Sequence, residues 1–193
     1  MEIRICGPRD RAPKNAIVVN TTSRAKDKWK ALSPFFLGPV NLPWGIESKN
    51  VENAWQFSKV YKEHLDKDGE LSAIKWATWA AKGWTSDYAH RYPMGRGARP
   101  EYACWPTGKL DYIESRKQIY CPLYSEAVLS TTVFQDLKKL ASQTSTLWLW
   151  DFDGYDHVKY GMALEEVLNY PRKKMGHAFV LAMLLEGKEL WKN

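Results

Sequence analysis

Long apolar runs are absent from this sequence. No stretch approaches the roughly 18 apolar residues that a membrane-spanning helix needs, and arginines interrupt residues 1–15, where the apolar core of a signal peptide would lie. Internal repeats and low-complexity linkers are also lacking, which argues against a solenoid or an array of domains. The 193 residues are therefore expected to form one soluble, cytoplasmic domain without a membrane partner.

Cysteine and histidine are scarce as well. The three cysteines, Cys6, Cys104 and Cys121, are odd in number and lie far apart, so neither a complete disulfide set nor a zinc site is indicated. Free, buried thiols in a reducing compartment are the expected state. No metal and no cofactor is predicted.

Basic and aromatic residues, by contrast, are abundant. The chain has 28 Lys and Arg against 22 Asp and Glu, and the net charge of +6 favours an anionic partner such as nucleic acid, a nucleotide or a phosphorylated metabolite. Ten Trp and ten Tyr exceed what an ordinary globular domain contains, so a role beyond packing is expected. A basic surface without a partner is the alternative, because net charge alone is a weak signal.

Apolar residues follow helical spacing over most of the chain. The predicted helices cover residues 50–65, 71–82, 110–126, 132–142 and 172–185. The most strand-like run is TLWLWDF, residues 146–152, where bulky apolar residues meet a turn-forming DGYD. Shorter runs at 3–6 and 16–20 predict an arm or hairpin over residues 1–31, packed on a main domain of residues 32–193. The predicted fold class is α+β, a mainly α-helical single domain with short β-strands.

A polar stripe runs along the predicted helix at residues 50–65. Its members are Glu52, Gln56, Lys59 and Glu63, and the opposite, apolar face consists of Ala54, Phe57, Tyr61 and Leu65. A solvated outer face is the simpler interpretation, because glutamate near a helix N-terminus and Glu–Lys spacing of this kind suit a helix surface. Trp55 favours one wall of a site instead, since it lies beside the stripe and would be costly to expose.

The loop MGRGARPEY, residues 94–102, combines glycines with arginines. Gly95 and Gly97 permit close backbone approach, while Arg96 and Arg99 offer forked donors suited to phosphate oxygens. The loop is neither a Walker motif, because it lacks the G-K-[ST] end, nor a dinucleotide fingerprint. Alone it is a weak signal for a phosphate site.

The segment WDFDGYDH, residues 150–157, gathers carboxylates directly after the predicted strand. It resembles the start of a calcium loop, but Met162 stands where such a loop needs its bidentate glutamate. Asp151 and Asp153, beside Trp150, are better interpreted as the rim of a site, and a capped turn remains the alternative.

Five stretches in this order resemble the NADAR (YbiA-like) superfamily: LSPFFLGPV, NVENAWQFSKV, MGRGARP, LWLWDFDGYD and KMGHAFVLAMLL. The motifs cover most of residues 32–187, and they are also similar to a phage-associated family of unassigned function. The chain departs from the superfamily pattern in three places. Asn53 replaces the histidine after the glutamate, Lys173 replaces an asparagine before the last helix, and an aspartate before the tryptophan is missing.

This resemblance implies an N-glycosidase, a hydrolase that cleaves the bond between a base or amine and ribose. ADP-ribosylated guanine, ADP-ribosylated DNA and related ADP-ribose or ribosylamino nucleotides are the implied substrates, met in the host cytoplasm if the chain is phage-encoded. The family positions fall on Glu52, Gln56, Lys59, Gly95, Arg96, Trp150 and Gly176. Asp151 or Asp153 is the candidate for a second carboxylate.

The chemistry of such a cleavage suits these residue types. Positive charge develops on the ribose, so a carboxylate, expected to be Glu52 with Asp151 or Asp153, stabilises the transition state or activates water. The predicted substrate-binding residues are Trp55, Gln56, Lys59, Gly95, Arg96, Arg99 and Trp150. The competing hypothesis is a non-catalytic, basic and aromatic-rich module that binds nucleic acid, and a structural interaction protein is a third.

Overall fold

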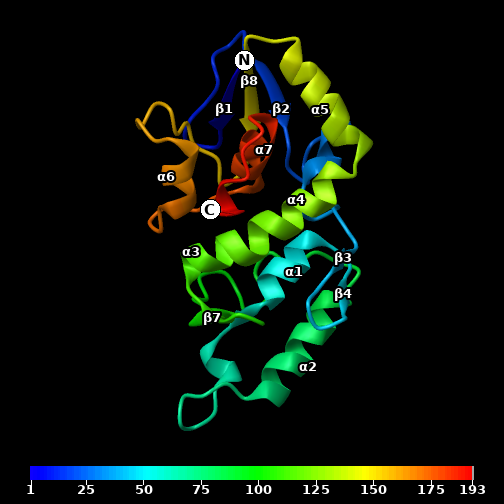
Figure 1. Ribbon diagram of the computed structural model, residues 1–193, viewed down its shortest axis with the longest axis vertical. Helices are drawn as coiled ribbons and strands as arrows, with labels where there is room; N and C mark the ends of the chain where they lie inside the picture. Colours follow the sequence, from blue (N-terminus) through cyan, green and yellow to red (C-terminus); the bar gives the residue numbers. More distant parts are fainter. Residues whose placement is uncertain (193) are drawn as a thin grey trace.

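A parallel three-stranded sheet lies at one end of the molecule (Figure 1). The computed structural model, which describes residues 1–192, places β8 (Thr146–Trp150) between β1 (Glu2–Cys6) and β2 (Ile17–Asn20). Leu149 lies opposite Ile5 on one side and Val19 on the other. Because β1 and β2 both pair with β8 and not with each other, the predicted N-terminal hairpin is wrong, and residues 1–31 supply both outer strands of the sheet.

The last helix covers this sheet. Helix α7 (His177–Leu185) packs against β1, and all of its residues from His177 to Met183 are buried, as the apolar pattern predicted. It begins later than predicted, because residues 172–176 form a turn that leads into it. Helix α6 (Leu164–Asn169) precedes that turn and was not predicted.

A long helix crosses the middle of the molecule (Figure 1). It consists of α3 (Tyr112–Ser115), a π-helical turn (Arg116–Tyr120) and α4 (Cys121–Leu129). Pro122 has no N–H to donate, and it stands where the π-helical turn passes into α4, so the lost hydrogen bond falls at an existing irregularity and the helix continues to Leu129. Helix α5 (Thr132–Ser142) then follows within its predicted bounds, with Thr131 as its N-cap.

The other end of the molecule holds shorter elements. They are α1 (Val51–Phe57), α2 (Ala73–Trp84), the pair β3 (Val40–Asn41) and β4 (Glu47–Ser48), the antiparallel sheet of β5 (Lys59–Val60), β6 (Tyr102–Trp105) and β7 (Gly108–Leu110), and 3-10 turns at Lys28–Leu32, Lys62–His64 and Leu190–Lys192. Helix α1 ends earlier than predicted because β5 leaves it to pair with β6. Gly83 does not end α2. A Cβ there would lie 2.0 Å from the Phe57 ring, so only glycine lets the two helices touch.

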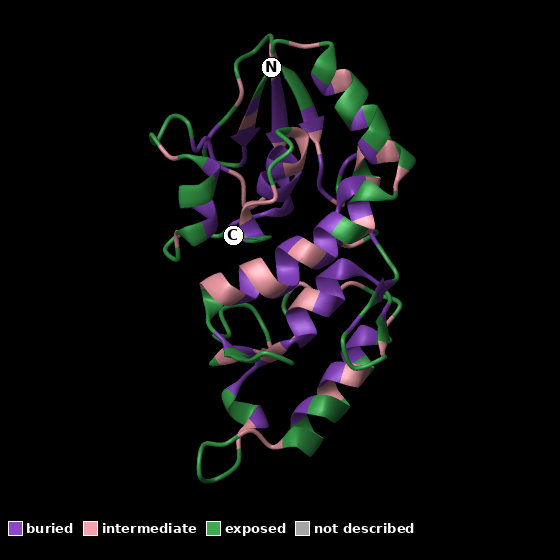
Figure 2. Cartoon of the chain, in the orientation of Figure 1, coloured by how far each residue is buried: buried purple, intermediate pink, exposed green. Residues whose placement is uncertain are grey.

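One continuous core joins the two ends (Figure 2). Buried side chains run from the parallel sheet through α7 and α4 into α1 and α2. The chain is thus an α+β single domain, as predicted. None of the helices described within residues 1–192 is long and apolar enough to cross a membrane.

Candidate functional site

The polar stripe of α1 faces inward. Asn50 caps the helix, its side chain accepting a hydrogen bond from the Asn53 N–H at 2.8 Å. The Glu52 N–H donates to the Pro34 carbonyl at 3.0 Å, so a proline-rich segment closes over the first turn. Glu52 is only 6% exposed and Gln56 9%. The interpretation as a solvated face is therefore wrong for Glu52 and Gln56, whereas Glu63 is exposed in the 3-10 turn Lys62–His64.

The stripe forms a hydrogen-bonded relay. Lys59 Nζ donates to Gln56 Oε1 at 2.7 Å, and Gln56 Nε2 donates to Glu52 Oε1 at 2.9 Å. Lys59 lies beyond the end of α1, but its side chain folds back, and Nζ also sits 4.5 Å from the centre of the Trp55 ring. The second Glu52 oxygen, Oε2, has no hydrogen-bond partner within residues 1–192 and keeps contact with solvent.

Burial changes the acidity of both ends of this relay. It raises the pKa of Glu52, and the hydrogen bond from Gln56 and the charges of Lys59, Arg91 and His177 oppose that rise. Burial also lowers the pKa of Lys59 to about 8, although the Glu52 carboxylate acts in the opposite direction. A carboxylate with a raised pKa close to a lysine with a lowered pKa is typical of functional sites.

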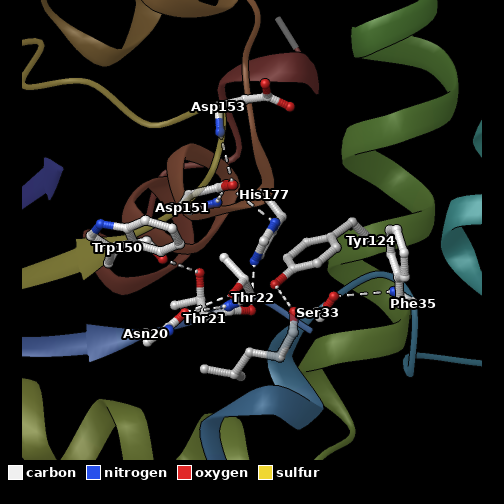
Figure 3. Close-up of polar contacts among 12 residues, drawn as sticks. Asn20, Thr21, Thr22, Ser33, Phe35, Tyr124, Trp150, Asp151, Asp153 and His177 are labelled. Atoms are coloured by element: carbon white, nitrogen blue, oxygen red, sulfur yellow. Dashed lines mark hydrogen bonds and ion pairs between the residues drawn. The ribbon is translucent and has the colours of Figure 1, made fainter. Parts of the chain in front are cut away.

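A second carboxylate, Asp151, lies where the central strand β8 ends (Figure 3). Its Oδ2 atom accepts a hydrogen bond from the Ala178 N–H at 3.1 Å and lies 3.1 Å from His177 Nδ1. Its Oδ1 atom accepts one from the Asp153 N–H at 3.2 Å. Asp151 thus caps the N-terminus of α7 from another part of the chain. A Cβ on Gly176 would lie 2.1 Å from Oδ2, which explains the glycine there.

His177 connects this carboxylate to the neighbouring strand. Its Nε2 atom lies 2.8 Å from the Thr21 carbonyl, just beyond β2, and the Thr21 hydroxyl donates to the Trp150 carbonyl at 3.1 Å (Figure 3). The Thr21 carbonyl can only accept a hydrogen bond, so Nε2 carries a proton and donates to it, while Nδ1 faces the Asp151 carboxylate. Every oxygen of Asp151 therefore already has a partner.

Arg91 brings a positive charge to the same region. Its Nη2 atom pairs with Asp153 Oδ2 at 2.9 Å, and its guanidinium lies 5.5 Å from the ring centres of both Phe152 and Tyr92. Arg24 approaches the Phe152 ring at 5.2 Å. Arginines and rings thus form a half-exposed rim beside the two carboxylates.

The glycine–arginine loop, residues 94–102, was predicted to bind substrate, but its arginines make few contacts with the rest of this site. Gly95 has a φ of 92° and Gly97 one of 95°, a backbone conformation that favours glycine, but Arg96 and Arg99 are exposed. Arg96 lies 5.8 Å from the ring centre of Tyr92, which is its connection to the rim. Arg99 forms no ion pair within the described chain.

The two tryptophans predicted to bind substrate are both half-buried. Trp150 meets Phe152 edge-on, with ring centres 5.0 Å apart. Trp55 packs against Tyr120, with ring centres 5.2 Å apart. Two hollows, of about 410 and 420 Å³, lie elsewhere, and Glu52 lines neither. The first is lined by residues 15–17, 143–146 and 148, and the second by Tyr160, Met162, Glu166, Tyr170 and Lys173.

Sequence reasoning missed three residues of this cluster. His177 stood within the motif KMGH and directly after a family glycine, which was a usable signal. Arg91 precedes a tyrosine and a proline in a turn, which is a weak one. Tyr120 carries no local signal, because its place depends on the π-helical turn.

A model of a protein family of unknown function (DUF6939) matches residues 9–161. The chain belongs to this family. Within DUF6939 the match contains the Glu52 relay, Arg91, Asp151 and Asp153, and it ends before His177. No curated protein and no solved structure matches this member of the family.

Proposed function

We propose that this DUF6939 protein is an N-glycosidase that hydrolyses a base–ribose bond in ADP-ribosylated guanine, ADP-ribosylated DNA or a related ADP-ribose nucleotide, on a NADAR-like fold. The observation that carries the proposal is the state of Glu52. It is a buried carboxylate with one oxygen held by Gln56 and the other unbound and in contact with solvent.

Such a carboxylate suits the cleavage of a C–N glycosidic bond. The bond breaks with its electron pair going to the base, and positive charge develops on the ribose. Glu52 Oε2 stabilises that charge and takes a proton from the water whose oxygen bonds to C1′. The departing base finally carries this proton, so one water is consumed and Glu52 returns to its ionised form.

The other two candidate carboxylates, Asp151 and Asp153, are better suited to holding neighbouring groups in position. Asp151 has partners on both oxygens and holds His177 and α7 in place. Asp153 pairs with Arg91 and orients its guanidinium. We therefore assign proton transfer to Glu52 alone and positioning to Asp151 and Asp153.

The rim offers contacts for the rest of such a substrate. Arg91 and Lys59 are half-buried cations suited to phosphate oxygens, and Arg24 and Lys174 are exposed cations beside rings of the rim. Phe152, Tyr92, Trp55 and Trp150 offer ring faces or edges for a base.

The test is release of ADP-ribose, measured by mass spectrometry, from ADP-ribosylated guanosine, ADP-ribosylated DNA and NAD. Hydrolysis of at least one substrate by the wild type, and none by Glu52→Gln, supports the proposal. A wild type that cleaves none of the three contradicts it.

A nucleic-acid-binding module is distinguished by competition. If the protein is an enzyme with one site for the adduct, free ADP-ribose should displace bound ADP-ribosylated DNA. Millimolar ADP-ribose should also raise the melting temperature, because a ligand stabilises the folded state that it binds. A general binder should release DNA to any polyanion and ignore ADP-ribose. DNA binding by the enzyme and by the general binder should weaken with rising salt concentration to the same degree, so this dependence alone does not distinguish the two hypotheses.

A further inference from the structure

Two tyrosines one turn apart on the long central helix use their hydroxyl groups differently. Tyr120 ends the π-helical turn and Tyr124 lies in α4, and both rings are buried. The Tyr124 hydroxyl donates to the Leu32 carbonyl at 2.6 Å (Figure 3). The Tyr120 hydroxyl has no partner in the part of the chain that the structure describes, yet it keeps contact with solvent. The Tyr102 and Tyr155 hydroxyls also lack a partner, but both are closed off from solvent, whereas a ligand could reach the Tyr120 hydroxyl.

Tyr120 lies beside the carboxylate of the proposed reaction. Its ring packs on Trp55, and α1, which carries both Trp55 and Glu52, packs against the π-helical turn. Burial raises the pKa of the Tyr120 hydroxyl well above its usual value, and the negative charges of Glu52 and then Asp151 raise it further. The hydroxyl therefore stays protonated near neutral pH and can donate a hydrogen bond.

A buried arginine fixes the position of this turn. Arg116 opens the π-helical turn and is 1% exposed. Its guanidinium donates to the carbonyls of Val167, Leu168, Tyr170 and Lys173. These bonds tie the turn to the segment between α6 and α7. Single π-helical turns within helices often occur at functional sites, and here the turn determines which side of the helix Tyr120 occupies.

We propose that Tyr120 is a second catalytic residue of the N-glycosidase reaction, donating a hydrogen bond from Oη to the departing base. The proposal rests on the function proposed above. As the C1′–N bond breaks, its electron pair collects on the base, and a donor aimed at the base stabilises that negative charge. Glu52 thus stabilises the charge on the ribose and activates the water, and Tyr120 stabilises the leaving base.

A neutral donor has an advantage over a cation at this position. Lys59 is already bound to Gln56. A second ammonium close to Glu52 would form an ion pair with the carboxylate and occupy its free oxygen, Oε2. A phenol stabilises the leaving base without neutralising the carboxylate.

The experiment compares Tyr120→Phe with Tyr124→Phe, which removes the same atom one turn away. For Tyr120→Phe we expect kcat to fall on the order of 100-fold while the melting temperature stays within about 2 °C of wild type. For Tyr124→Phe we expect a melting temperature lower by about 2–4 °C, because the Leu32 carbonyl loses its partner, and a kcat within about twofold of wild type. Equal kcat values for Tyr120→Phe and wild type overturn the proposal.

A binding measurement separates this proposal from the proposed function. Guanosine is titrated into wild type and both variants while tryptophan fluorescence is followed, since Trp55 contacts Tyr120. If the wild type cleaves no substrate, the N-glycosidase function fails, and a catalytic Tyr120 fails with it. Weaker guanosine binding in Tyr120→Phe alone supports Tyr120 as the residue that contacts the base, and equal binding in all three proteins contradicts it.

Discussion

Glu52 and Asp151 are both nearly inaccessible carboxylates, at 6% and 3% exposure, yet their surroundings differ. Asp151 receives a backbone N–H on each oxygen, and His177 Nδ1 lies 3.1 Å from one of them. Glu52 receives one side-chain amide on one oxygen and nothing on the other within residues 1–192. Burial is therefore a poor guide to the role of a carboxylate, and the number of unbound oxygens is a better one.

The difference follows from where each residue lies. Asp151 directly follows the central strand, where the N-terminus of α7 supplies N–H groups that must find acceptors. Glu52 lies in the first turn of α1, but its side chain turns toward its own helix and the relay from Lys59. One carboxylate stabilises the fold, and the other is available to a substrate.

The largest expected effect is on turnover, in Glu52→Gln. This change keeps the shape of the side chain and removes the charge, so kcat should fall at least about 1,000-fold, because the developing positive charge loses its partner. The melting temperature should stay equal or rise, since a buried charge is lost. Release of ADP-ribose and thermal denaturation measure the two quantities. Activity within a few fold of wild type would show that Glu52 is not catalytic.

Asp151→Asn should show the opposite pattern in the stability measurement. It replaces a buried carboxylate oxygen by an NH2 group that cannot accept from the backbone N–H donors around it, and it removes the charge beside His177. We expect this to cost about 3–5 kcal/mol of unfolding free energy. The melting temperature should drop on the order of 10 °C. An unchanged melting temperature would mean that these contacts contribute nothing to the fold, and the contrast with Glu52 would disappear.

A smaller effect is expected from pH. Below about pH 8 Lys59 is positively charged, and above that value it becomes neutral, because burial lowers its pKa to about 8. The Kd for ADP-ribose should therefore rise about tenfold on the alkaline side, as one cation–phosphate contact is lost. Calorimetry across this pH range measures it. In Lys59→Arg the rise should move to much higher pH, and a rise that stays near pH 8 would assign it to another group.

The smallest effect is expected at Arg96, which is exposed. Arg96→Ala should weaken binding of a phosphate-bearing substrate about two- to threefold, because an exposed ionic contact contributes little. Arg91→Ala, at the half-buried rim, should weaken it about tenfold. A substrate without phosphates should be insensitive to Arg96→Ala. Equal responses of both substrates would indicate a structural role for Arg96.

Much of the fold could be predicted because its signals are local. The apolar spacing of residues 132–142 coincides with α5, and the predicted strand-like run at 146–152 begins with β8 and extends beyond its end at Trp150. The early end of α1 could not be predicted, since Lys59 and Val60 leave the helix only to pair with β6, more distant in the chain. The central position of β8 depends on pairing between distant strands and had no local signal either.

The candidate site, too, could be predicted only where its residues lie close together in the sequence. The grouping of Glu52, Gln56 and Lys59 was predicted from their spacing, although Lys59 lies in β5 and its side chain reaches back to Gln56. The roles of Asp151 and Tyr120 were not, because they depend on the N-terminus of α7 and on carbonyl groups bound by Arg116. Contacts between distant segments decide which polar residues are satisfied, and local sequence does not record them.

The order of strands in the parallel sheet has a consequence for synthesis. Strands β1 and β2 emerge from the ribosome early and have no partner until β8 follows, after helices α1 to α5. Such late, non-local pairing slows folding and leaves strand edges open in the meantime. Asp151 arrives directly after this strand, but His177 follows only with α7, so the site is completed after the sheet. A chain that ends before α7 lacks His177, so it cannot bring Asp151, His177 and Glu52 together.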